Sequence, residues 1–580
     1  MSAASYLSIA ALAGLLVLST PLLGVYMAKV YGGGNAPGDR FFLPIERFIY
    51  RICRVDPKQE QSWRAYSVCL LVFSSVGIVM TYVILRMQSI LPLNPDHMRS
   101  VSPSLAFNTA VSFATNTDWQ SYGGESTMSQ LSQMAGLVWH QFFSAAVGMA
   151  VAVALIRALT RRRGTTLGNF WADTVRSVTR ILLPISLVFA ILFVSQGVIQ
   201  NFHAEKTVTT LAATATHNVA LQQKVPGGPV ASMLSIEVLG DNGGGYFNTN
   251  GSYPYAGPNA IVPLLCTWLM LMIPFAFPVT FGKMVGSRRQ GVVVLAAMAV
   301  LFSLSVAAVV PLENAGNPNL SAEGVTQRAT AANPGGNFEG KDVRFGATSS
   351  ALVAASVTAT SAGYTNAAHE SFVPLGGAVP LFNMMLGEVD PGGSGGGLYG
   401  LLVVLLLTVF IAGLMVGRTP EYLGKKLGAA DMKMAAVYIL IVPATVLIFA
   451  GASLLLHGPA GDMLSTGPHG LTEVVYAFAS SANNNGSAFA GLSANNPYWN
   501  TALAISMLIG RYLGMIVVLA LAGSLVRKPV YAVSAGTLRT DSPLFTGMLM
   551  VVVVVLVGLT YFPALALGPI VEHLAGHYPL

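Results

Sequence analysis

The sequence predicts an all-α polytopic membrane protein with ten transmembrane helices, eight of which form four pseudo-repeated helix–pore-loop–helix units. Composition is the first reason, because the 580 residues are 53% hydrophobic and only 9% charged, whereas soluble domains carry about 25% charged residues. The second reason is a set of Asn- and Gly-rich turns that recur about every 120 residues, which indicates an internal repeat. The third is the distribution of Lys and Arg, which gather in alternate loops.

Ten apolar runs are long enough to cross a bilayer, which takes about 20 residues of helix. They are residues 4–29, 63–88, 130–158, 178–201, 258–282, 290–311, 373–417, 434–457, 498–525 and 544–570. The first run lacks a basic leader and an obvious cleavage site, so we expect a retained anchor helix and not a signal peptide. The chain then divides into an N-terminal helix and loop (1–62), repeat 1 (63–158), repeat 2 (159–289), repeat 3 (290–433), repeat 4 (434–525) and a C-terminal helix (526–580).

The seventh run is interrupted by a Gly-rich segment from Leu386 to Gly400. Pro380 and Pro391 also disfavour a continuous helix there. We therefore expect two half-helices that meet inside the bilayer, with Glu388 and Asp390 at the break acting as a gate or branch point.

Lys and Arg distinguish the two sides of the predicted membrane protein. Loops at 30–62, 159–177, 283–289, 418–433 and 526–543, with their flanks, hold 23 of the 31 basic residues. The loops on the other side hold 7, and Arg511 lies within a span. The positive-inside rule places the first set in the cytoplasm, so both termini and all four turns are predicted outside. The net charge of +7 thus reflects topology and does not indicate a nucleic-acid partner.

The four turns are TNTDWQ, DNGGGY, SAGYTN and SANNNGSA, and each follows a semi-apolar run too short to span. Asn and Gly favour turns and left-handed backbone. At membrane depth such irregular backbone is tolerated only where protein buries it or where it lines a watery cavity. Rings of backbone carbonyls replace the hydration shell of an ion in channel filters, and the negative ends of the preceding short helices favour a cation. The pattern predicts re-entrant pore helices and a filter for a monovalent cation such as K⁺, although any one such turn in isolation is more often a plain loop.

Arg511 stands near the middle of the ninth span. A charge there is costly in lipid and should face the bundle interior. Below a cation filter it would oppose free passage of the ion; the alternative is that it merely pairs with a helix end.

The enzymatic signatures in the sequence are weak. The matches to G-x-S-x-G (Gly392 to Gly396) and G-x-G-x-x-G (Gly395 to Gly400) lie in the broken apolar run and follow no predicted strand. His369-Glu370 lacks the second His of HExxH, and the three cysteines have no CxxC spacing. Neither GxxxxGK[ST] nor DKTG occurs. We therefore expect no catalytic residues, no His/carboxylate metal set and no ATP site on this chain.

Five longer motifs resemble one known family over essentially the full length. They are TNTDWQSY (Thr115 to Tyr122), GGGYFNTN (Gly243 to Asn250), HESFVPLGG (His369 to Gly377), GLMVGRTPEYLGKK (Gly413 to Lys426) and ANNNGSAFAGLSANNP (Ala482 to Pro497). The sequence is similar to the channel-like A subunit of the Kdp potassium pump, a bacterial P-type ATPase complex.

The resemblance implies a K⁺-binding subunit for high-affinity uptake that takes K⁺ from outside and passes it to a partner. The implied partners are a P-type ATPase catalytic subunit that hydrolyses ATP, an accessory periplasm-facing subunit, a small single-helix subunit and the lipid of the bacterial inner membrane. The alternative is a stand-alone K⁺ channel or symporter of the same superfamily.

The resemblance also assigns site residues. Those that would form or brace the filter are Thr115, Asn116, Thr117, Gln120, Asn242, Gly243, Gly244, Ser361, Gly363, Asn484, Asn485 and Gly486, and Asp118, Ala362 and Asn483 belong to the same turns. The segment from Gly387 to Gly397, with Glu388, Asp390, Gly392, Gly393 and Gly395, would block direct exit, and Arg418 would lie near the cytoplasmic face.

Two acidic residues depart from the family pattern: Asp118 stands where Asn is common and Asp241 where Thr is common. We expect their carboxylates to raise the local cation concentration at the mouth of the filter.

Overall fold

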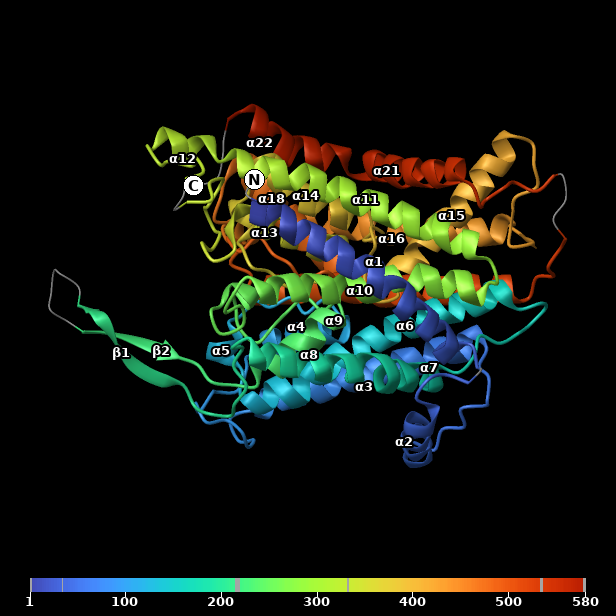
Figure 1. The fold of residues 1–580 in the computed structure, drawn as a ribbon, viewed down its shortest axis with the longest axis horizontal. Helices are drawn as coiled ribbons and strands as arrows, with labels where there is room; N and C mark the ends of the chain where they lie inside the picture. The colour runs from blue at the N-terminus through green and yellow to red at the C-terminus, as the bar shows by residue number, and fades with distance from the viewer. Residues whose placement is uncertain (1–2, 34, 214–219, 331–332, 533–535, 577–580) are drawn as a thin grey trace.

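The computed structural model describes residues 3–33, 35–213, 220–330, 333–532 and 536–576. Within these residues ten helices are long and apolar enough to cross a membrane, as predicted. They run roughly parallel along the long axis of the molecule, and α1 begins near the end where α22 finishes (Figure 1). The elements of these spans are α1 (Ala3–Tyr31), α3 (Trp63–Met87), η1 (Ser132–Val138) with α6 (Trp139–Thr160), α7 (Phe170–Arg176) with η2 (Ser177–Leu182) and α8 (Leu183–Ser195), α10 (Ile261–Met284), α11 (Arg288–Ala315), α15 (Gly396–Met415), α16 (Ala429–Leu455), α19 (Pro497–Leu508) with η5 (Ile509–Leu513) and α20 (Gly514–Val526), and α21 (Pro543–Leu565) with η6 (Ala566–Ile570) and α22 (Val571–Leu574).

Four short helices lie between the spans and reach only part of the way through the bundle. They are α4 (Pro103–Ala114), α9 (Val230–Leu239), α13 (Gly346–Ala359) and α18 (Gly467–Asn483). Each follows one span and precedes the next, so the described chain contains the four helix–pore-loop–helix units that the sequence predicts.

The second span of each unit forms the centre of the molecule. The buried shares of these four spans are 83%, 78%, 72% and 61%, against 28% to 44% for the first spans and 22% for the two terminal ones. A helix that is hydrophobic all round is expected wherever protein or lipid surrounds every face. Hydropathy alone therefore cannot distinguish the inner helices from the lipid-facing ones, whereas burial within the bundle can.

The predicted break in the seventh span is confirmed, but its two halves are unequal. α14 (Pro374–Met385) has 12 residues, and α15 has 20. By length α15 can cross the membrane alone and α14 cannot. The irregular segment between them, residues 386–395, is hydrogen-bonded to the second, third and fourth turns.

Strands make up 3% of the residues and lie in the segments between the spans. β1 (Lys206–Ala213) and β2 (Ala220–Val225) pair antiparallel, with Lys206 opposite Val225, and project from the end of the bundle near α5 (Gly124–Thr127) (Figure 1). β3 (Glu421–Tyr422) and β4 (Lys425–Lys426) form a two-residue ladder in the loop after α15. The remaining short elements are α2 (Asp39–Ile52), η3 (Asn250–Ser252), α12 (Pro318–Ala322), η4 (His369–Ser371) and α17 (His457–Ala460).

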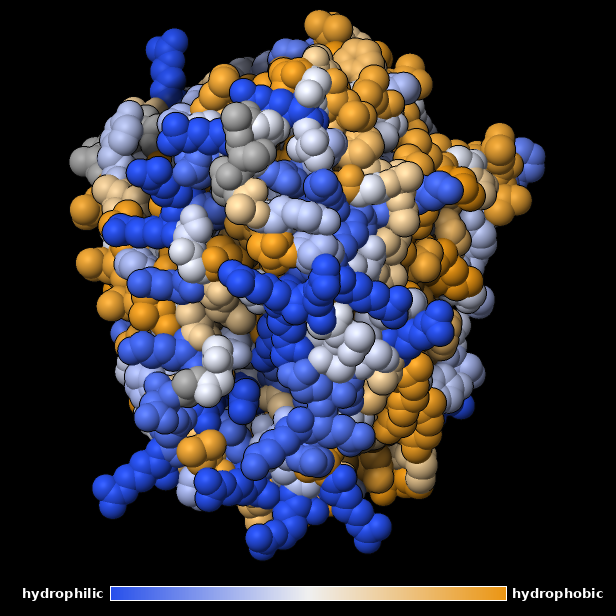
Figure 2. All heavy atoms as spheres, turned by 90° about the vertical axis from the view of Figure 1, so that its right-hand side faces the viewer, coloured by the Kyte–Doolittle hydropathy of each residue, from blue (hydrophilic) through white to orange (hydrophobic). Residues whose placement is uncertain are grey.

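The opposite end of the bundle, where α6 leads into α7, is strongly hydrophilic. Figure 2 looks onto this end and shows hydrophilic side chains across its middle, bordered by hydrophobic helix flanks. The loops that connect the spans here include 161–169 and 416–428, which belong to the Lys- and Arg-rich set.

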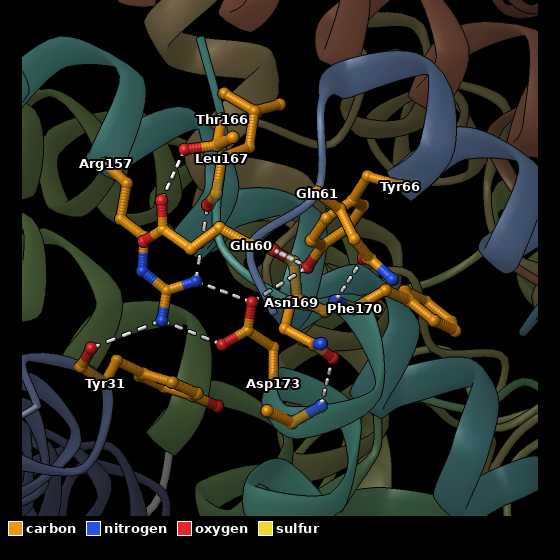
Figure 3. A network of polar contacts seen from close by, with 12 residues as sticks. Tyr31, Glu60, Gln61, Tyr66, Arg157, Thr166, Leu167, Asn169, Phe170 and Asp173 are labelled. Atoms are coloured by element: carbon orange, nitrogen blue, oxygen red, sulfur yellow. Dashed lines mark hydrogen bonds and ion pairs between the residues drawn. The ribbon is translucent and has the colours of Figure 1, made fainter. Parts of the chain in front are cut away.

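A buried ion pair joins α6 to α7 at this end (Figure 3). Arg157 donates two hydrogen bonds to the Asp173 carboxylate, at 2.6 and 2.8 Å. Tyr66 on α3 donates to the same carboxylate at 3.0 Å, and Arg157 also donates to the Tyr31 carbonyl at the end of α1. The pair therefore holds four helices together, and the Asp173 side chain is only 1% exposed.

Replacing Asp173 by Ala should destabilise the fold strongly, because it leaves the Arg157 guanidinium without its buried partner. Loss of one member of a buried pair costs about 3 kcal/mol or more. We expect a clear drop in the midpoint of thermal unfolding in detergent, followed by tryptophan fluorescence. Asp541→Ala is the control, since Asp541 pairs with Arg539, whose side chain is 70% exposed, and equal effects of the two substitutions would contradict this assignment.

Candidate functional site

The four Asn- and Gly-rich turns meet inside the bundle, directly after the four pore helices. In the first, second and fourth turns the backbone leaves helical geometry through residues with positive φ, which are Asn116 (68°), Asp241 (53°), Asn484 (63°) and Gly486 (99°). Asn and Asp tolerate this left-handed conformation better than other residues with a side chain, and Gly adopts it freely. The local sequence thus explains why these pore helices stop where they do.

Three glycines show how closely the turns approach one another. A Cβ atom on Gly243 would overlap the Thr117 carbonyl oxygen and lie 2.5 Å from the carbonyl oxygen of Asn485. A Cβ on Gly486 would overlap the same Thr117 oxygen, and one on Gly363 would lie 2.6 Å from the Gly243 oxygen. Backbone from all four turns therefore surrounds one place, with carbonyl oxygens of three of them next to it.

Side-chain amides hold the turns in these positions. Asn116 donates to the carbonyls of Gly240 and Asp241 in the second turn. Asn484 donates to Thr117 Oγ1 at 2.9 Å and to the Met507 carbonyl at 3.1 Å. Asn485 donates to the carbonyls of Val357 and Thr360, next to the third turn.

Further members of the candidate filter complete these cross-links. Thr115 Oγ1 and Thr117 Oγ1 are hydrogen-bonded at 2.8 Å, and the Gly363 N–H donates to the Asn242 carbonyl at 3.3 Å. Gln120 exchanges two hydrogen bonds with Gly245, beside Gly244. Ala362 is fully buried, and Asn483 donates back to its own helix at Ala479.

Two residues of α6 belong to this arrangement and were not predicted from the sequence. Gln141 donates to the Gly244 carbonyl at 2.9 Å, and Ser144 donates to Asn116 Oδ1 at 2.8 Å. Both are buried on the inner face of a span. A polar residue inside an apolar span is a functional signal in itself, and it could have identified them.

The expectation that Asp118 and Asp241 enrich cations at an open mouth is wrong, because both side chains are fully buried. Asp118 Oδ2 accepts from Gln141 on α6 at 3.2 Å, and Asp241 Oδ2 accepts from Ser394 in the break of the seventh span at 2.6 Å. The two carboxylates therefore connect the first and second turns to neighbouring elements and do not face bulk water.

The break of the seventh span packs against the third and fourth turns. Glu388 accepts hydrogen bonds from Asn485 Nδ2 at 2.9 Å and from Ser361 Oγ. The Gly392 N–H donates to the carbonyl of Ala359 at 2.8 Å. Gly387, Gly392 and Gly395 have positive φ, and a Cβ on Gly393 would lie 2.5 Å from Ser361 Oγ, so the glycines permit this close approach.

Arg511 lies under the turns, in the π-helical segment η5. Its guanidinium donates to the Ser144 carbonyl of α6 at 2.8 Å. Arg511, Glu388, Gly387 and Asn484 all line a cavity of about 120 Å³. A carboxyl group and a guanidinium group therefore border one small space beneath the turns.

Asp390 and Arg418 stand apart from these contacts. Asp390 is fully buried in the break, and neither of its carboxylate oxygens has a hydrogen-bond partner among the described residues. Arg418 follows α15 at the end remote from the break, is exposed, and donates to the Thr537 carbonyl. The 20 residues of α15 separate Arg418 from the turns by about 30 Å at 1.5 Å per residue.

The chain matches a known family over residues 10–574, described as "Potassium-transporting ATPase A subunit". A potassium-transporting ATPase potassium-binding subunit of Mycobacterium tuberculosis is 53% identical over 577 residues, which cover 99% of this chain and 100% of the relative. The protein of the same name from Sorangium cellulosum is 52% identical over 565 residues, 97% of each chain.

A solved structure has a similar fold. The potassium transporter TrkH from Vibrio parahaemolyticus superposes with a TM-score of 0.50 at 15% identity, covering 89% of this chain and 98% of TrkH. At this identity the likeness concerns the fold alone. The family match covers nearly the whole sequence, and the two relatives are 53% and 52% identical along it. On that basis this chain belongs to the family of potassium-transporting ATPase A subunits.

Proposed function

We propose that this chain binds K⁺ at the meeting point of the four turns and translocates it as the non-hydrolytic subunit of an ATP-driven uptake pump. The observation that carries the proposal is the crowding of backbone at Gly243, where a Cβ would meet carbonyl oxygens of both the first and the fourth turn. Converging carbonyl dipoles replace the water of a desolvated cation. The names of the relatives, potassium-binding subunits, support K⁺ as that cation.

The filter in this proposal consists of backbone from Thr117, Gly243, Gly363 and Asn485 to Gly486. Asn116, Asn242, Asn484, Gln120 and Thr115 brace it through side-chain hydrogen bonds. The C-terminal ends of α4, α9, α13 and α18 lead directly into the turns. The helix dipole is negative at this end, which favours a cation there.

The elements beneath the turns oppose straight passage through the chain. The irregular segment 386–395 lies under the third and fourth turns, and the Arg511 guanidinium faces the cavity next to it. A fixed positive charge raises the electrostatic barrier for a cation. We infer that K⁺ leaves the filter sideways, towards a partner chain, instead of crossing to the far side within this one.

ATP hydrolysis in this proposal belongs to a separate P-type catalytic subunit. An accessory periplasm-facing subunit and a small single-helix subunit would complete the complex in the bacterial inner membrane. The 23 basic residues on one set of loops support an orientation with both termini and the filter entrance outside.

A stand-alone channel or symporter is the second candidate, favoured by the fold shared with TrkH. The two functions differ in whether an ATPase chain purifies with this one, and in whether K⁺ flux requires ATP.

Gly243→Ala should weaken the K⁺ dependence of ATP hydrolysis by the complex purified through a tag on this chain. The added methyl group displaces the Thr117 carbonyl, so we expect the half-saturating K⁺ concentration to rise at least tenfold, or about 1.4 kcal/mol of binding free energy. Gly547→Ala is the matched control, because nothing lies within 4 Å of a Cβ on Gly547. Unchanged K⁺ dependence in Gly243→Ala would exclude this filter, and K⁺ flux from this chain with no ATPase in the preparation would favour the channel.

Arg511→Gln should make the complex permeable to K⁺ without ATP, because it removes the charge that faces the cavity. We expect passive ⁸⁶Rb⁺ uptake into proteoliposomes to rise several-fold over wild type. Arg418→Gln removes an exposed charge at the far end of α15 and should leave the flux at the wild-type level. If passive ⁸⁶Rb⁺ uptake by both variants equals that of wild type, Arg511 is not a barrier to the ion.

A further inference from the structure

Three metal-ligating side chains meet at the end of the bundle where the filter turns open, outside the residues assigned to K⁺. Glu370 comes from the segment after the third turn, and His469 and Glu473 are four residues apart on α18, so they share one face of that helix. One ligand atom from each lies within 4.8 Å of the other two. The expectation that the chain has no set of His and carboxylate ligands is therefore wrong. Glu370 lies about 100 residues from the other two, and no local motif marks it.

Each of the three side chains is held by a hydrogen bond through the atom that does not face the others. The Gly491 N–H donates to Glu370 Oε2, and the Ser465 N–H donates to Glu473 Oε1 at 3.0 Å. His469 Nδ1 lies 2.8 Å from Glu572 Oε1 of α22. The orientation of all three groups is therefore fixed before any ion arrives.

The atoms left over face one another and have no hydrogen-bond partner among the described residues. They are Glu370 Oε1, Glu473 Oε2 and His469 Nε2. His469 Nε2 and Glu370 Oε1 are 3.8 Å apart, too far for a hydrogen bond. This distance fits two ligands of a single ion with metal–ligand bonds of about 2.0–2.2 Å.

Burial makes the unpartnered Glu473 oxygen costly unless a proton or a metal ion is bound to it. Glu473 is completely buried, and an unpaired buried carboxylate oxygen carries a desolvation penalty. Glu370 and His469 side chains are each 13% exposed, so an ion can reach the set from the solvent at this end.

We propose that Glu370 Oε1, Glu473 Oε2 and His469 Nε2 bind a divalent transition metal ion of the Zn²⁺ class. One imidazole and two carboxylates are a donor set suited to Zn²⁺. The His469–Glu572 hydrogen bond is the kind of outer contact that fixes the tautomer of a metal-bound histidine. The ion would link Glu370, in the segment after the third turn, to His469 and Glu473 of α18. The hydrogen bond between His469 and Glu572 would extend this link to α22.

Protons compete with the metal for the same atoms. Burial lowers the pKa of His469, but the carboxylates of Glu370 and Glu572 outweigh burial and raise it to about 9. Burial, together with the nearby Glu370 carboxyl, raises the pKa of Glu473 to about 7. Metal binding to these atoms is therefore coupled to the release of protons.

The test uses the full-length chain in detergent after treatment with EDTA. Equilibrium dialysis against Zn²⁺ with elemental analysis measures stoichiometry and affinity, and Co²⁺ substitution reports coordination through its visible d–d absorption. We expect one ion per wild-type chain and at least a tenfold weaker affinity in Glu473→Gln, which keeps the Ser465 hydrogen bond but loses the ligand oxygen. His457→Gln, which replaces an exposed histidine on α17, should bind as wild type does.

A second variant keeps the result decisive if Glu473→Gln is poorly folded. A Cβ on Gly491 would overlap Glu370 Oε1, so Gly491→Ala should displace that ligand without changing any charge. We expect Zn²⁺ to raise the thermal unfolding midpoint of wild type and not that of either variant. Equal Zn²⁺ binding by wild type and both variants, or no Zn²⁺ binding and no thermal shift in wild type, would overturn the proposal and leave a proton-linked cluster.

Discussion

Backbone polar groups of four irregular turns lie inside an apolar bundle, and the surrounding structure depends on keeping them there. In such a place every N–H and C=O needs a partner, since lipid offers none. The turns supply donors from their own Asn side chains, so that Asn116, Asn484 and Asn485 each reach a carbonyl or hydroxyl of another turn or its pore helix. Carbonyls of Thr117, Gly243 and Asn485 border the common centre, where an ion can take the place of hydrogen-bond donors.

The same constraint explains why polar residues enter helices that are otherwise apolar. Gln141 and Ser144 interrupt the inner face of α6 because the first two turns need donors from that side. Ser361 and Asn485 share Glu388 of the broken span. Glu388 thus links the third turn, the fourth turn and the break, so a shift of the break would also move these two turns.

The acidic residues show how position decides what a charge can do. Asp118 and Asp241 are completely buried and hydrogen-bonded to Gln141 and Ser394, which suits bracing better than attraction of ions from solution. In this pair and in the pair of Glu370 and Glu473, each residue keeps one carboxylate oxygen without a partner in the described part of the chain. The pairs differ in their surroundings, because Glu370 lies beside His469 with its side chain 13% exposed, so solvent reaches the cluster of Glu370, His469 and Glu473.

The membrane class, the ten spans, the four repeated turns and the break in the seventh span all follow from the amino-acid sequence, because hydropathy, repeat spacing and the positions of Gly and Pro are local properties. The turn residues follow too, since Asn and Gly are favoured wherever the backbone adopts positive φ. Three features became evident from the folded chain alone: which helices are central, where Asp118 and Asp241 point, and how Gln141 and Ser144 hold the first two turns. The same holds for Glu370, which meets His469 and Glu473 from about 100 positions away. Contacts of this kind depend on how elements distant in the chain pack together, and no local pattern of residues records them.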